Sequence, residues 1–181
     1  MSVTAKEVVD FWRDAGPERW FAKDETFDDM CEMAFGDASD DAVAGGMEDW
    51  ESDAEGALAL VILLDQIPRN THRDSAKAYA GDERARRVAD AAIQSGFDVQ
   101  VAPELQRFFY IPFMHSESLE DQQRSVELNS ASGDADSAKW AQHHHDIIER
   151  FGRFPHRNAA LGRISTPEEQ AYLEAGGGFG S

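Results

Sequence analysis

Apolar residues in this chain recur mostly three and four positions apart, the spacing that places side chains on one face of an α-helix. The clearest case lies between residues 82 and 96, where the apolar positions follow this spacing without a break: Ala85, Val88, Ala89, Ala92 and Ile93. No stretch alternates apolar and polar residues for long enough to indicate a β-strand. We therefore expect an all-α fold of antiparallel helix pairs joined by short turns.

Capping residues predict where several helices begin and end. Thr4 and Ser52 each precede a glutamate by three positions, which is the spacing of a capping box. Thr166 is followed by proline and two acids, another typical helix start. Asp24 is expected to begin a helix that ends at Gly36, because glycine readily adopts the left-handed conformation that closes a helix.

Residues 57–64 are apolar on nearly every side, which predicts a buried central helix. Pro68 lacks a backbone N–H, so we expect this helix to end just before it. Asp65 would then lie in the last turn, and Arg69 and Asn70 would lie at its exit.

A later helix, from Asp136 to Gly152, carries a histidine on its apolar face. The predicted inward stripe contains Trp140, His144, Ile147, Ile148 and Phe151. A buried imidazole needs polar partners, so His144 predicts others nearby in the fold.

Length and composition favour one compact soluble domain. The chain has 181 residues, of which 41% are hydrophobic, enough for a single core. We expect a helical domain over residues 1–175 and a flexible glycine-rich tail over residues 176–181. Cys31 is the one cysteine, so no intrachain disulfide can form, and we expect it in the core. The N-terminal residues do not resemble a signal peptide, and together with the single cysteine this favours a cytoplasmic protein. The longest apolar run is too short to span a bilayer.

The net charge restricts the classes of partner. Thirty-five acidic residues against 17 basic ones give a formal charge of -18. Such a charge opposes sequence-independent binding to nucleic acid or to an anionic membrane. We therefore expect no nucleic-acid partner and no membrane partner.

Several polar and aromatic blocks resemble the DUF924 family, whose function is unknown and whose fold is tetratricopeptide-like. The blocks are Trp20, Phe21, Asp24, Phe27 and Asp28, LDQIPRN at residues 64–70, HSE at residues 115–117 with Gln123 after it, HHDIIERFGRFPHRN at residues 144–158, and Leu161, Gly162, Arg163, Ser165 and Thr166. His72 departs from the family, which more often has an apolar residue there. The resemblance implies an all-α, single-domain helical array like the tetratricopeptide fold and names no reaction or cofactor.

The polar residues of these blocks lie at helix ends or on inward stripes, where antiparallel packing can gather them into one pocket. We predict an enzyme-like site for a small anionic metabolite, with His144 as general base and Glu117 or Asp65 orienting it. Arginines and amides would bind and clamp the anion. The predicted ligand-binding residues are Arg69, Asn70, His115, Arg153, His156, Arg157 and Asn158.

Three other interpretations stay open. The chain could be a tetratricopeptide-like module that binds a protein or peptide in a concave groove. It could be a metal-binding enzyme that uses His115, Glu117, His144 and His156, although no HExxH or CxxC motif supports this. Finally, the polar groups could only satisfy one another within the fold.

Overall fold

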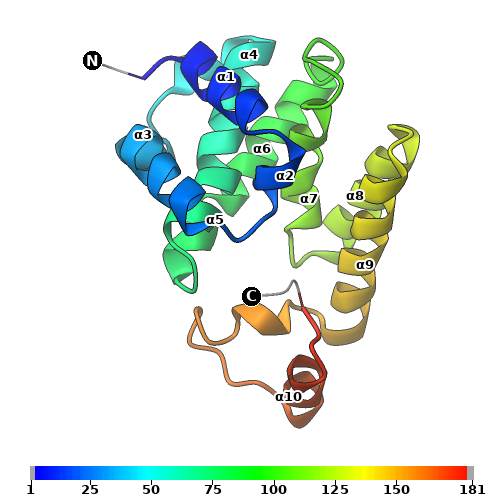
Figure 1. The fold of residues 1–181 in the computed structure, drawn as a ribbon. Helices are drawn as coiled ribbons and strands as arrows, with labels where there is room; N and C mark the ends of the chain where they lie inside the picture. Colours follow the sequence, from blue (N-terminus) through cyan, green and yellow to red (C-terminus); the bar gives the residue numbers. More distant parts are fainter. Residues whose placement is uncertain (1–2, 179–181) are drawn as a thin grey trace. The chain divides into compact units, whose positions relative to one another are not determined.

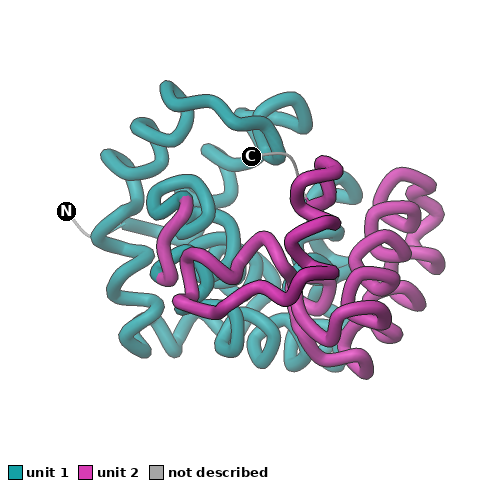
Figure 2. Tube along the Cα trace, turned by 90° about the horizontal axis from the view of Figure 1, so that it is seen from below, with its two compact units in different colours: residues 1–73, 77–112 teal, residues 74–76, 113–181 magenta. Residues whose placement is uncertain are grey.

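The computed structural model describes residues 3–178, and every regular element in this range is helical, which confirms the all-α class. The chain forms two compact units (Figure 2). Unit 1 comprises residues 1–73 and 77–112, and unit 2 comprises residues 74–76 and 113–181. The single domain expected over residues 1–175 and the tetratricopeptide-like arrangement stay predictions, and the end of the expected tail, residues 179–181, lies outside the described residues.

The helices follow one another in short segments (Figure 1). Unit 1 contains α1 (Ala5–Ala15), α2 (Pro17–Trp20), α3 (Glu25–Val43), α4 (Ala54–Val61), α5 (Ile67–Thr71) and α6 (Asp82–Gln94), with 3₁₀ turns at Glu48–Ser52 and Gln106–Phe109. A further 3₁₀ turn, Ala76–Tyr79, begins in the short segment 74–76 of unit 2 and ends in unit 1. The boundary between the units falls within α7 (Ile111–Met114). Unit 2 contains α8 (Leu119–Ala131), α9 (Ala135–Phe151) and α10 (Pro167–Glu174), with a 3₁₀ turn at Pro155–Arg157.

Most of the predicted helix starts are confirmed. The side chains of Thr4 and Thr166 form the expected capping boxes, and Asp24 caps α3. The cap predicted at Ser52 is wrong, because Asp53 accepts the hydrogen bond from the Gly56 amide instead. An aspartate one position later offers a carboxylate at the correct distance from that amide.

The end predicted for the second helix is also wrong, because α3 continues through Gly36 to Val43. Its inner side carries buried Phe35, Ala38 and Ala42 on both sides of the glycine. Glycine inside a helix costs only about 1 kcal/mol relative to alanine. Burial of these side chains outweighs that cost and carries the helix past its predicted stop.

Pro68 does not end the central helix either, because a π-helical turn over Ile62–Gln66 connects α4 directly to α5. In this turn the Ile67 amide bonds to the Ile62 carbonyl. The Leu63 carbonyl, which would accept that amide in an α-helix, accepts the Ser39 hydroxyl at 2.7 Å. The π-helical turn thus gives the Ile67 amide and the Leu63 carbonyl, just before the proline, partners other than each other.

The central helix is the core of unit 1. All side chains from Ala57 to Leu64 are buried, as the sequence predicts, and α4 packs against α1 and α6. Cys31 is buried as predicted, and burial raises the pKa of its thiol to about 12. Within residues 3–178, no helix combines the length and the apolar composition needed to cross a membrane.

Gly81 lies so close to the central helix that a side chain there would meet the backbone carbonyl of Leu64. We expect Gly81→Ala to lower the free energy of unfolding by about 1–3 kcal/mol, because neither backbone segment can move freely. Urea denaturation followed by circular dichroism measures the change. Gly36→Ala is the matched control: its new methyl group meets only the flexible Glu32 side chain, so stability should stay the same or rise by up to about 1 kcal/mol. Equal effects of the two substitutions would contradict the close approach.

Candidate functional site

In unit 1, the predicted residues Asp65 and Arg69 form an ion pair at the end of the central helix. The Arg69 guanidinium lies 3.2 Å from an Asp65 oxygen and donates two hydrogen bonds to Asp82, at 2.8 and 3.0 Å. Burial lowers the pKa of Arg69, but the two carboxylates raise it more, so the pKa lies above its usual value. Arg69 is therefore a partly buried, charged group that ties the central helix to α6.

Asn70 belongs to a second contact in the same unit. Its amide donates to Asp28 at 2.8 Å, and Arg73 donates to the same carboxylate at 2.5 and 2.9 Å. Asp28 lies on α3, so these bonds connect α5 with α3. Thus Asp65, Arg69 and Asn70 all bond to neighbours that hold helices together.

In unit 2, Glu117 joins two loop segments. Its oxygens accept hydrogen bonds from Arg163 at 2.7 and 2.9 Å and from the Phe154 amide at 2.8 Å. Burial raises the pKa of Glu117, but Arg163 and the amide lower it more, so the carboxylate stays ionised. The role predicted for Glu117, orienting the imidazole of His144, is filled by a backbone group described below.

Arg153 and Asn158 also serve the fold of unit 2. Both donate to the carboxylate of Glu169 in α10, Arg153 at 2.7 and 2.9 Å and Asn158 at 3.2 Å. Glu169 is 2% exposed and closes the capping box of α10. The Arg153 bond and the Thr166 amide lower the pKa of Glu169 to about 2 against the opposing effect of burial.

His144 is buried on α9, as the sequence predicts, and its ring is oriented by the helix itself. Its Nδ1 lies 2.7 Å from the Trp140 carbonyl. A carbonyl can only accept, so Nδ1 carries the hydrogen and Nε2 carries the lone pair. Burial is the main cause that holds the pKa of His144 well below 6.5, and the neighbouring His115 lowers it further. Trp140 itself is 49% exposed, so its predicted place on the inward stripe is wrong.

His115 and Arg157 lie beside His144. The rings of His115 and His144 are 6.2 Å apart, and Arg157 donates to the His115 carbonyl at 2.9 Å. The Arg157 guanidinium carbon lies 4.5 Å from the centroid of the Phe154 ring, and the His144 ring also lies against this ring. His156 lies against the same Phe154 ring, at 5.6 Å. The structure therefore brings His115, His144 and Arg157 into one group in unit 2.

Sequence reasoning missed Gln122, which holds the backbone of this group. Its amide donates to the carbonyls of Met114 at 2.7 Å and Ser116 at 2.6 Å, on both sides of His115. Gln122 is fully buried, whereas Gln123, the residue in the family resemblance, is exposed. The signal that could have found it is a polar stripe of small and amide side chains on α8: Gln122, Ser125 and Asn129, all fully buried.

The predicted metal ligands are not gathered into one group. Among residues 3–178, the one set of at least three such side chains whose ligand atoms lie within 4.8 Å of one another is His145, Asp146 and Glu149 on α9. Asp146 and Glu149 are exposed and His145 is half-buried.

Comparison with known proteins identifies the class of protein. The model of a family described as bacterial proteins of unknown function, DUF924, matches residues 8–177. The chain belongs to this family, as the sequence blocks predict. A solved structure of the protein of unknown function ATU0120 from Agrobacterium tumefaciens is similar, with 47% identity, a TM-score of 0.91, and coverage of 94% of this chain and 97% of that one. A search of curated proteins finds no match.

The pKa of Glu169 predicts how unit 2 responds to acid. Because folding lowers this pKa from 4.5 to about 2, the ionised carboxylate stabilises the fold above pH 4.5, and this contribution is lost as the pH falls toward 2. We expect Glu169→Gln to lower the urea midpoint at neutral pH and to reduce the loss of stability as the pH falls from 4.5 toward 2. Glu168→Gln is the control, because its partner Arg150 is a surface residue, so its effect should stay within about 0.5 kcal/mol. Parallel pH profiles for Glu169→Gln and the parent protein would contradict the assignment.

Proposed function

We propose that this cytoplasmic member of the DUF924 family binds a small anion at His115, His144 and Arg157 and carries out acid–base chemistry on it. The observation that carries the proposal is His144, an imidazole kept neutral with its Nδ1 hydrogen committed to the Trp140 carbonyl. This tautomer leaves Nε2 as the atom that can accept a proton. A neutral, oriented imidazole is what a general base requires, and the neighbouring Arg157 favours an anionic ligand.

The charges around His144 favour an anion. Arg157 is permanently charged and is 6% exposed, and its guanidinium lies over the Phe154 ring. Arg157, His115 and His143 each lower the pKa of His144, which means that positive charge disfavours a proton there until a negative group arrives. A carboxylate or phosphate would supply that negative group and accept hydrogen bonds from the guanidinium.

The same charges suit a reaction that develops negative charge. When His144 removes a proton from a bound anion, the ligand becomes more negative, and nearby Arg157 and His115 stabilise that charge. The backbone bonds from Gln122 and Arg157 keep the His115 segment fixed in place during the transfer. His115 is partly exposed, so it can exchange protons with solvent.

The polar residues of unit 1 are not part of this proposal, because Asp65, Arg69 and Asn70 are engaged in bonds between helices. The alternative of a tetratricopeptide-like module that binds a peptide stays a prediction. A peptide terminus carries the same carboxylate that Arg157 would recognise. A site for a small metabolite should bind a small anion that has no peptide chain, whereas a peptide-binding module should not. Binding of such an anion therefore distinguishes the two functions.

Phosphate is the first probe of this site. In NMR spectra of ¹⁵N-labelled protein, we expect His144 to show the Nδ1-protonated tautomer at neutral pH and a pKa below 6.5. Phosphate should raise this pKa, because a bound anion stabilises the imidazolium form. Arg157→Lys should weaken phosphate binding about tenfold, since lysine lacks the planar fork.

Arg150→Lys is the matched control, because Arg150 is an exposed arginine on α9, the helix that carries His144. It should leave the affinity for phosphate unchanged. A protonated His144 at neutral pH, or equal affinity in both arginine variants, would contradict the anion site. Binding of a carboxyl-terminal peptide with no response to phosphate would favour the peptide-binding alternative.

A further inference from the structure

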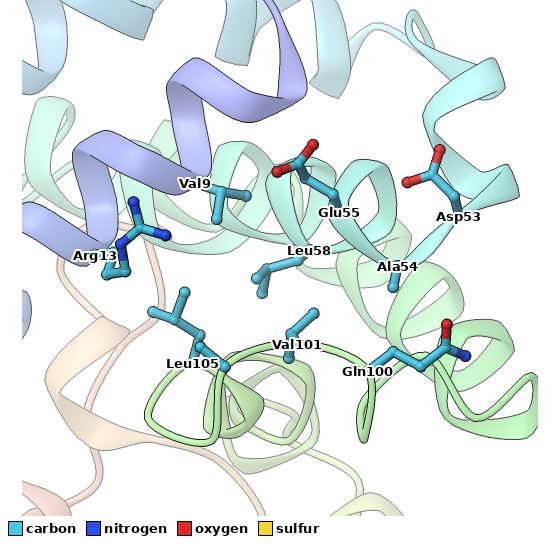
Figure 3. A pocket seen from close by; sticks show the side chains of 10 residues that line it. Val9, Arg13, Asp53, Ala54, Glu55, Leu58, Gln100, Val101 and Leu105 are labelled. Atoms are coloured by element: carbon cyan, nitrogen blue, oxygen red, sulfur yellow. The ribbon is translucent and has the colours of Figure 1, made fainter.

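A cavity of about 350 Å³ in unit 1 lies between α1, the start of α4 and the segment at residues 100–105 (Figure 3). Its charged side chains, Arg13, Asp53 and Glu55, stand at separate points around an apolar middle (Figure 3). Recognition of a polar ligand needs side-chain atoms that converge on one point. Such a convergence is found on α9, in unit 2, and not in this cavity.

Three side chains that can ligate a metal ion come together on one turn of α9. They are His145, Asp146 and Glu149, and one ligand atom of each lies within 4.8 Å of the other two. His145 and Glu149 are four positions apart, so their side chains share one face of the helix. Asp146 approaches His145 from the next position, and its Oδ1 lies 3.4 Å from His145 Nδ1.

The distance between His145 and Asp146 fits a shared metal ion. Zinc lies about 2.0–2.2 Å from an imidazole nitrogen or a carboxylate oxygen, so two ligands at a tetrahedral angle are about 3.4 Å apart. Within residues 3–178, Glu149 makes no hydrogen bond or ion pair, and its side chain is exposed. A change of rotamer can therefore bring its carboxylate to the same ion at little cost.

The position of Gln142 shows that His145 and Asp146 already face a common point. The Gln142 amide nitrogen donates to Asp146 Oδ1 at 2.7 Å and lies 3.5 Å from His145 Nδ1. A positively polarised N–H group thus lies between the carboxylate and the ring nitrogen. A cation would replace this group, and the amide, turned by half a rotation, would offer its oxygen as a fourth ligand.

The kind of ligand atom selects the kind of cation. One imidazole nitrogen with carboxylate oxygens suits Zn²⁺ and its neighbours in the first transition series, whereas Mg²⁺ and Ca²⁺ prefer oxygen ligands alone. The two carboxylates also balance the two positive charges of the ion. Arg150 follows Glu149 in the chain but pairs with Glu168 at 2.9 Å, so it leaves the Glu149 carboxylate available.

We propose that His145, Asp146 and Glu149 bind a divalent transition-metal ion such as Zn²⁺, with Gln142 as a further ligand. This metal site is distinct from the anion site at His144, because neighbouring residues on a helix point about 100° apart. The ion would connect ligands within one turn of α9, the helix that carries His144. Because it binds the folded chain in preference to the unfolded one, it would raise the stability of the protein.

Zn²⁺ and Mg²⁺ test the site in the full-length protein at neutral pH. Calorimetry should give submillimolar binding of Zn²⁺, with changes in amide chemical shift centred on residues 142–149, and Zn²⁺ should raise the melting temperature. Mg²⁺ should bind more weakly and should leave these shifts unchanged. The comparison is diagnostic, because a net charge of -18 without a specific site attracts both divalent ions alike.

His145→Gln should weaken Zn²⁺ binding about tenfold or more, since loss of an outer-shell partner alone weakens metal sites by about 10–100-fold. His72→Gln is the matched control. His72 is also half-buried and lies 3.9 Å from a carboxylate, that of Asp40, but within residues 3–178 it belongs to no group of three ligands. This control should keep the affinity of the parent protein.

Glu149→Gln is a second test of the same site, because it removes one carboxylate ligand from an exposed position, where the fold does not depend on it. It should also weaken Zn²⁺ binding, with an unchanged circular dichroism spectrum. Binding of Mg²⁺ as tight as that of Zn²⁺, equal affinities of the two histidine variants, or Zn²⁺-induced shifts centred away from residues 142–149 would overturn the proposal.

Discussion

The ion pair of Arg69 with Asp65 and Asp82 is the contact on which the architecture of unit 1 depends. It connects the central helix to α6 at the place where the π-helical turn has already changed the backbone bonding. Asp65 is fully buried, and a buried charge that loses its partner costs up to about 3–5 kcal/mol. The position of α6, and with it the close approach of Gly81 to Leu64, therefore follows from satisfying one guanidinium.

The need to pair partly or fully buried charges also organises unit 2, where it leaves one imidazole neutral. Glu117 and Glu169 each receive an arginine and a backbone amide, so the loop between α9 and α10 is held at both ends. His144 is satisfied at Nδ1 by its own helix and stays neutral. The polar residues of this chain's signature blocks thus divide into a majority that hold helices together and a small group, around His144, whose chemistry suits a ligand.

Sequence patterns were sufficient where the interaction is local. The capping boxes at Thr4 and Thr166 depend on residues three positions apart, and both form. The burial of His144 follows from its place among isoleucines on one helical face. The family blocks likewise identified the right segments. They identified the wrong side chain at Gln123, because neighbouring residues on a helix point about 100° apart and only the packing of α8 decides which one is buried.

The sequence by itself determined the helical class, most helix starts, the buried central helix and the inward position of His144, because each depends on residues within a turn or two. The tertiary structure decided where helices end and which polar groups meet. Gly36 and Pro68 are stop signals in isolation, but burial of Phe35 and Ala42 carried one helix onward, and a Ser39 hydroxyl from another helix satisfied the backbone near the proline. Partners such as Asp82 for Arg69 and Arg163 for Glu117 lie 13 and 46 positions away. Such pairings have no local pattern, since only the packing of helices selects them.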